Sequence, residues 1–175
     1  LQTDSLNAQI RRMSFNEQSG FQLKKFALKA TATPKGIHLH DLNLSLPATT
    51  VNIDTFTVAG ELTAPDFISD TQTTYMGRLN ASVTPADIAC FVPALQHFQD
   101  SVNIDLAFHG RGKQARCTNF YLSSPHKALE IHAEGMLDHS NPSQPPYFFG
   151  QITQADADET AISWLIHNLK GTAAP

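Results

Sequence analysis

The sequence predicts a mainly β fold: a curved, twisted antiparallel sheet of repeated hairpins, shaped as a half-barrel or groove, with two short helices. Three observations predict it. A bent-strand pattern of apolar residues recurs five times, two hairpins align with each other without gaps, and hydrophobic residues make up 41% of the chain against 16% charged residues. The 175 residues suit one elongated β-groove segment spanning 1–175.

The recurring pattern is two pairs of apolar positions separated by two polar residues. Its copies are Ala8-Ile10-Met13-Phe15, Phe21-Leu23-Phe26-Leu28, Ile37-Leu39-Leu42-Leu44, Val51-Ile53-Phe56-Val58 and Ala115-Cys117-Phe120-Leu122. Strict alternation would turn the second pair to the opposite face of the strand, because side chains alternate between faces. A β-bulge at the polar pair absorbs the extra residue, keeps both pairs on one face and bends the strand. Two short strands joined by a turn are the alternative.

Further strands follow from a self-match and from simple alternation. The segment Leu39–Asp54 aligns without gaps to Cys117–His132, and each reads as strand, Pro-centred turn and strand, which is a hairpin. Alternating apolar residues predict additional strands over 77–83, 102–108 and 129–133.

Two helices and two loops complete the predicted elements. Thr84 as N-cap with Pro85 at the first position predicts a helix over 85–92, which ends before Pro93. An apolar stripe predicts a second helix over 156–170. Turn-rich composition predicts loops over 64–73 and 138–146.

The sequence carries no pattern typical of a catalytic site. It has no nucleophile elbow, no Gly-rich phosphate loop and no H-E-x-x-H or C-x-x-C motif. His38 and His40 share a strand face, but no third metal ligand lies at a diagnostic spacing. Cys90 lies in an apolar run and is predicted to be a buried thiol, with a disulfide to Cys117 as the alternative. We therefore predict no enzyme, no cofactor and no metal.

The charge and hydropathy of the chain limit the kinds of partner that we expect for it. The net charge of −4 gives no positive field for nucleic acid, so no nucleic-acid partner is predicted. No apolar run reaches the roughly 20 residues that a membrane helix needs. Because the chain starts at Leu1 without signal-peptide features, we expect any anchor or targeting signal to lie outside it.

Four segments resemble the TamB-type translocation and assembly module proteins of Bacteroidetes, in the AsmA-like family. They are Leu6–Phe15, Ser19–Leu23, Val83–Leu95 and Ile162–Gly171, and the resemblance covers nearly the whole chain in order. It implies an internal periplasmic fragment of a parent chain that is anchored in the inner membrane by a helix absent here. It also implies an apolar β-groove that conducts phospholipid, and an Omp85-type outer-membrane partner that binds other parts of the parent chain.

Repeat and resemblance together predict a non-catalytic groove that holds or conducts phospholipid acyl chains between the inner and outer membranes. The residues predicted to line it are Leu39, Leu42, Leu44, Val51, Ile53, Phe120, Leu122, Leu129 and Ile131. The alternative is a scaffold module with a closed core, which assists outer-membrane protein or autotransporter assembly through its strand edges. A carbohydrate-active enzyme is the third hypothesis, and it would require a deep polar pocket with facing carboxylates.

Overall fold

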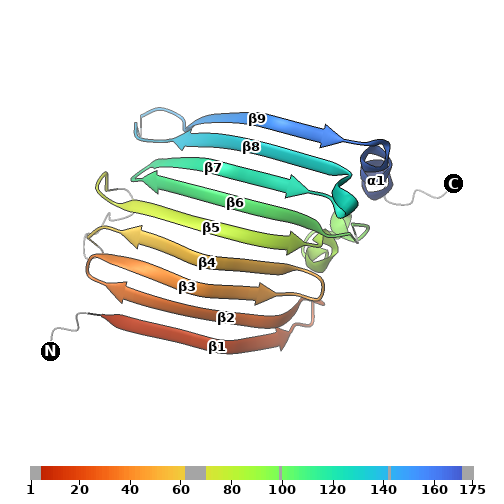
Figure 1. Ribbon diagram of the computed structural model, residues 1–175. Helices are drawn as coiled ribbons and strands as arrows, with labels where there is room; N and C mark the ends of the chain where they lie inside the picture. Colours follow the sequence, from red (N-terminus) through yellow and green to blue (C-terminus); the bar gives the residue numbers. More distant parts are fainter. Residues whose placement is uncertain (1–4, 62–69, 99, 142, 171–175) are drawn as a thin grey trace.

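The structure is a computed structural model that describes residues 5–61, 70–98, 100–141 and 143–170 (Figure 1). It contains one sheet of nine antiparallel strands in sequence order, followed by a helix. The elements are β1 (Leu6–Asn16), β2 (Gln22–Thr33), β3 (Gly36–Ser45), β4 (Thr50–Ala59), β5 (Thr74–Val83), β6 (Val102–Arg111), β7 (Gln114–Ser123), β8 (Leu129–Asp138), β9 (Tyr147–Ala157) and α1 (Glu159–Lys170).

The predicted fold class is confirmed: the chain is mainly β, and its sheet is curved and unclosed. Each strand pairs with its neighbours in sequence, so β1 and β9 form the two edges. Consecutive antiparallel strands joined by short turns are the simplest topology for repeated hairpins.

The structure has bulges at all five polar pairs of the repeat. In β1 the step from Ile10 to Met13 spans three residues, opposite the two-residue step from Leu28 to Phe26 in β2. An extra residue lies in the same way at the polar pairs of β2, β3, β4 and β7. A sixth bulge, in β9, lies outside the repeat. Because a bulge bends and twists its strand, bulges across the sheet account for its curvature.

The bulges preserve one continuous apolar face. A lateral row takes one apolar residue from each strand: Met13, Phe26, Leu44, Val51, Ala81, Ile104, Leu122, Ile131 and Ala155. On the opposite face, the neighbouring rows are polar. The bulges of β3 and β4 lie opposite each other, so His40 pairs with Thr55 and Leu42 pairs with Ile53 without a register shift. Matching bulges therefore keep the two faces chemically distinct.

The apolar face is covered by no second layer in the described part of the chain. The larger contacts join neighbouring strands, apart from α1 against β9 and the 3-10 helix Pro85–Ile88 against the 3-10 helix Pro93–Leu95. The described hydrophobic residues that are buried are Leu23, Leu46, Ala128 and Ala161. The sheet therefore exposes its apolar face instead of closing over a core.

The prediction of a helix over 85–92 is wrong. The segment forms a 3-10 helix at Pro85–Ile88 and a second one at Pro93–Leu95. Thr84 precedes the first, but its side chain does not cap it and instead contacts the hydroxyl of Ser101 at 2.6 Å. The residue before Pro93 is disfavoured in the α conformation, which leaves too few residues for a stable α-helix.

The predicted helix over 156–170 begins three residues late, at Glu159. Asp156 and Ala157 belong to β9, where they pair with Glu130 and Leu129 of β8. Of the predicted loops, residues 64–69 and 142 lie outside the described residues. The described parts of 64–73 and 138–146 precede β5 and separate β8 from β9, although Asp138 itself ends β8.

Candidate functional site

The nine predicted groove residues all lie on the apolar face, and all are half-buried. Across β3 and β4, Leu42 pairs with Ile53 and Leu44 pairs with Val51. Across β7 and β8, Leu122 pairs with Ile131. Directly opposed side chains of an antiparallel pair lie on one face, so these residues form two apolar clusters.

The remaining three predicted residues extend these clusters along the strands. Leu39 pairs with Phe56, Phe120 pairs with Ala133 and Leu129 pairs with Ala157. No charged residue occurs among these partners. The predicted set therefore covers the apolar face of β3, β4, β7 and β8.

Sequence reasoning missed the residues of β5 and β6 that connect the two clusters. The register runs from Ile53 through Leu79 and Leu106 to Phe120, so the apolar surface is continuous between the clusters. The signal was present, because simple alternation over 77–83 and 102–108 predicts which residues share a face. The prediction followed the two aligned hairpins, Leu39–Asp54 and Cys117–His132, which do not include β5 and β6.

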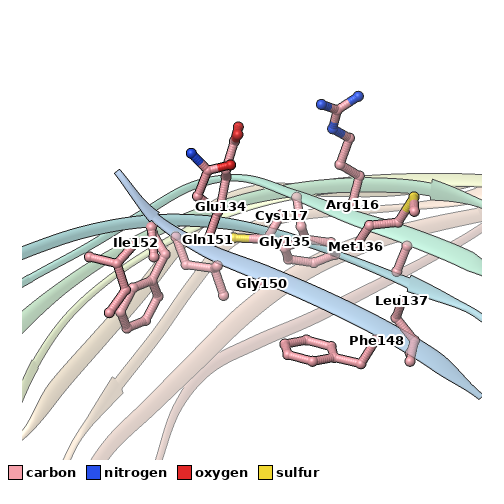
Figure 2. A pocket seen from close by; sticks show the side chains of 15 residues that line it. Arg116, Cys117, Glu134, Gly135, Met136, Leu137, Phe148, Gly150, Gln151 and Ile152 are labelled. Carbon is pink, nitrogen blue, oxygen red and sulfur yellow. The ribbon is translucent and has the colours of Figure 1, made fainter. Parts of the chain in front are cut away.

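A hollow of about 430 Å³ lies in this face between β6 and β9. Its apolar lining includes Leu106, Phe108, Phe120, Phe148 and Ile152; Phe120 alone of the nine predicted residues contributes to it. In Figure 2 the side chains of Phe148 and Ile152 lie on the opposite side of the sheet from Arg116 and Glu134. The hollow is therefore lined by apolar groups, while the charged ends point away from it.

Two glycines deepen the hollow. Gly135 of β8 pairs with Gly150 of β9. A Cβ on Gly150 would lie 3.2 Å from the Phe148 ring, and one on Gly135 would lie 3.0 Å from the carbonyl oxygen of Phe149. Side chains at both positions would therefore crowd this part of the face. No pattern in the sequence predicts the pair, because it depends on the β8–β9 register.

One end of the sheet, which we call the capped end, carries the long 84–101 connection and α1 (Figure 1). The Asp87 carboxylate accepts hydrogen bonds from the backbone N–H groups of Ala48 (2.9 Å) and Thr49 (2.6 Å) in the β3–β4 turn. The ring of Phe91 lies 5.4 Å from that of Phe21 in the β1–β2 connection. This connection therefore joins turns that are separated across the sheet.

The capped end is also linked to α1. The indole Nε1 of Trp164 donates to the Asp100 carboxylate at 2.8 Å. Together with the contacts of Asp87 and Phe91, this bond extends the linkage from the β1–β2 connection to the helix that follows β9. The opposite end, which we call the open end, carries the β2–β3, β4–β5, β6–β7 and β8–β9 connections.

Most of the shifted pKa values belong to groups on the polar face and at turns. A hydrogen bond to Asp105 raises the pKa of Arg78, and a hydrogen bond from Tyr121 lowers that of Glu130. On the apolar face, burial raises the pKa of Tyr75. These causes are an ion pair, a hydrogen bond and burial.

In the described ranges, the histidines and cysteines form neither a metal site nor a disulfide. The rings of His38 and His40 stack with centroids 6.2 Å apart, and no group of three His, Cys, Asp or Glu side chains there could hold a metal ion. Cys90 is exposed and Cys117 is half-buried, and both thiols are free. The prediction of a buried Cys90 is therefore wrong, because the 3-10 turns place it at the surface of the 84–101 connection.

Comparison with known proteins gives no match to a protein-family model, to a curated protein or to a solved structure. Among the described residues, no helix has both the length and the apolar character needed to cross a bilayer. What the site can do therefore follows from its own geometry, which is a wide apolar surface with a hollow between β6 and β9.

Proposed function

We propose that this chain is a non-catalytic periplasmic segment of a TamB-type, AsmA-like envelope protein. Its apolar face holds or conducts phospholipid acyl chains between the inner and outer membranes. The observation that carries the proposal is the apolar row that crosses all nine strands with no second layer over it in the described part. In the parent chain, an inner-membrane anchor and an Omp85-type outer-membrane partner would act through other parts.

The size of the face favours a lipid. With ordinary strand spacing and rise, nine strands of about ten residues present a face about 38 Å wide and 33 Å long. Its area, of order 1,000 Å², exceeds the 300–600 Å² of the largest apolar patch on a typical soluble monomer. A surface this large is stabilised by an apolar partner.

An acyl chain is a suitable partner in energy and in shape. Each CH₂ removed from water gains about 0.8 kcal/mol. Because this gain is non-directional, a chain can slide along a continuous apolar surface with little change in free energy. The head group needs no dedicated polar site if it stays in water beyond the edge of the face. The apolar lining of the hollow between β6 and β9 agrees with this arrangement.

The test uses two neighbouring residues of β6 that lie on opposite faces. Phe108 lines the hollow, whereas His109 is exposed on the polar face. We expect Phe108→Glu to weaken binding of a fluorescent phosphatidylethanolamine by about tenfold or more, because a carboxylate must lose water beside the acyl chain. The matched variant, His109→Glu, should bind as the wild type does.

Binding is measured with the purified, delipidated chain, and circular dichroism confirms that both variants keep their strand content. Equal phosphatidylethanolamine binding by wild type and Phe108→Glu would contradict the proposal. Absence of binding by the wild-type chain would contradict it as well.

The two edge strands favour a second candidate, a scaffold that assists outer-membrane protein or autotransporter assembly. All residues of β1 and β9 are exposed, including Phe148 at 73% and Leu6 at 67%. An unpaired edge can bind an extended segment of another protein by β-augmentation. A photo-crosslinker at Gln154 of β9, which is exposed and lies outside the hollow, should then capture protein, whereas one at Leu106 should capture lipid. Lipid at both positions would favour the groove function alone.

A further inference from the structure

The polar face carries a second hollow, on the side of the sheet opposite the apolar face. Its volume is about 380 Å³, and it lies over β4, β5, β6 and β7. The polar side chains that matter most in it are Asn52, Asn80, Ser82, Asn103, Asp105 and Tyr121. The register places Asn52 beside Asn80, and Asn80 beside Asp105, in one row across three strands. Amides and hydroxyls therefore converge on one region of the sheet.

Asparagine is an unexpected residue at these positions. It is depleted in strands, because its short amide competes for backbone hydrogen bonds. Three asparagines nevertheless line the hollow from three adjacent strands, at Asn52, Asn80 and Asn103. When a set of residues contradicts local propensity at one place, a functional role is the usual reason.

Hydrogen bonding within the sheet does not account for all of them. Asn52 is bonded to Asn43, and Asn119 donates to Asp105 at 3.1 Å. By contrast, the side-chain amides of Asn80 and Asn103 have no hydrogen-bond partner within the described residues. Each unpaired amide offers two donors and one acceptor to a ligand.

The charge of the hollow is compensated. The guanidinium of Arg78 lies 2.8 Å from the Asp105 carboxylate, so the one acidic group in the lining is already paired. No excess positive charge is left to favour a phosphate or another anion. The ligand that matches this lining is uncharged and carries many groups that both donate and accept hydrogen bonds.

We propose that this hollow binds a neutral saccharide. Sugar hydroxyls both donate and accept hydrogen bonds, as the amides of Asn80 and Asn103 do. Ser82 and Asp105 each add a hydrogen-bond acceptor to the lining. Tyr121 supplies an aromatic ring at the edge, against which the apolar face of a pyranose can pack. The site is independent of the acyl-chain function, because it occupies the other face of the sheet.

Calorimetric titration of the whole chain with cellotetraose, maltotetraose and chitotetraose tests the proposal. At least one of these three probes should bind with a Kd of about 1 mM or tighter. If none of the three binds at a concentration of about 10 mM, the proposal is overturned.

Threonine substitutions separate a binding role from a structural one. Thr is preferred in strands, so Asn80→Thr and Asn103→Thr should keep or raise the Tm while weakening saccharide binding about fivefold or more. Gln9→Thr is the control, because Gln9 is exposed on the polar side of β1 and lies outside the hollow. It should leave binding unchanged. A lower Tm with unaltered binding in the two asparagine variants would overturn the proposal.

Phosphatidylethanolamine binding distinguishes a failure of the saccharide site from a failure of the proposed acyl-chain function. Asn80→Thr should leave it unchanged, because Asn80 and the acyl-chain residues lie on opposite faces. Failure of lipid binding in the wild type would contradict the groove function without affecting the saccharide titration. Parallel loss of lipid and saccharide binding in Asn80→Thr would overturn the assignment of a separate site.

Discussion

The capped end and the open end of the sheet are held together differently. At the capped end, Phe91 contacts Phe21 and Trp164 contacts Asp100, which joins segments that are not neighbours in the sheet. At the open end, the guanidinium of Arg111 donates to the carbonyl oxygen of Thr71 at 2.5 Å, from β6 to the connection that precedes β5. The Tyr75 hydroxyl there donates to the carbonyl oxygen of Gln114 at 2.7 Å, from β5 to β7. The contacts that span the greater part of the sheet therefore lie at the capped end.

The distribution of buried residues agrees with this difference. The buried apolar residues of the described chain, Leu23, Leu46, Ala128 and Ala161, all lie in connections, strand starts or the helix of the capped end. The rest of the apolar face is largely half-buried on the inner strands and exposed on β1 and β9. A small core at one end fixes the shape of the sheet, and the remaining apolar surface is left available to a ligand.

Removing the Asp87 carboxylate should be the most damaging change at the capped end. Asp87→Ala leaves the N–H groups of Ala48 and Thr49 without their acceptor, and Thr49 is buried. We expect a loss of about 2 kcal/mol in the free energy of unfolding, measured by urea denaturation, because bonds to a charged acceptor are stronger than neutral ones. The chain should keep its strand content at low urea.

The matched variant at the open end is Asp70→Ala. Within the described residues, the Asp70 carboxylate accepts one hydrogen bond, from the N–H of Gln72 at 3.0 Å. Its removal should lower the free energy of unfolding by about 0.5 kcal/mol. Equal losses for Asp87→Ala and Asp70→Ala would show that the two ends contribute equally to stability.

The contact between Phe91 and Phe21 should have a smaller effect. Phe91 is 61% exposed, so its truncation forfeits mainly the ring contact at 5.4 Å. A double-mutant cycle of Phe91→Ala and Phe21→Ala should give a coupling energy of about 0.5–1.5 kcal/mol. A coupling energy near zero would mean that the 84–101 connection does not restrain the β1–β2 connection in solution.

Local and non-local features differ in how far the sequence predicts them. The five bulges of the repeat were predictable, because each is encoded by two polar residues between apolar pairs in one strand. The apolar face of β3, β4, β7 and β8 was predictable from that repeat together with the two aligned hairpins. The 84–101 connection was not, because Asp87 bonds to a turn nearly forty residues away and Phe91 packs on a ring seventy residues away. The hollow between β6 and β9 depends on Gly150, whose partner is fixed by an unpredicted bulge in β9.

A fall in pH should lower the local stability of both ends of the sheet. At the capped end, this loss should affect the helix α1. Asp158 precedes the helix, and its carboxylate accepts hydrogen bonds from the Thr160 hydroxyl (2.6 Å) and the Ala161 N–H (2.9 Å), which lower its pKa below the ordinary value. A carboxyl with a lowered folded pKa contributes stability that is fully present above its unfolded pKa and is lost as pH falls through the folded one. Helicity of α1 should therefore decrease below about pH 4.

Asp158→Asn isolates this contribution. Asparagine is also a good N-cap, so the helix should persist at neutral pH while its acid-induced loss disappears. The measurement is the set of ¹³Cα chemical shifts of α1 as a function of pH. At the open end, hydrogen bonds from Ser140 lower the pKa of Asp138. The stability that Asp138 contributes there should therefore also be lost as pH falls, both in the wild type and in Asp158→Asn. If α1 loses helicity equally with pH in the variant, Asp158 is not the group that couples the helix to acid.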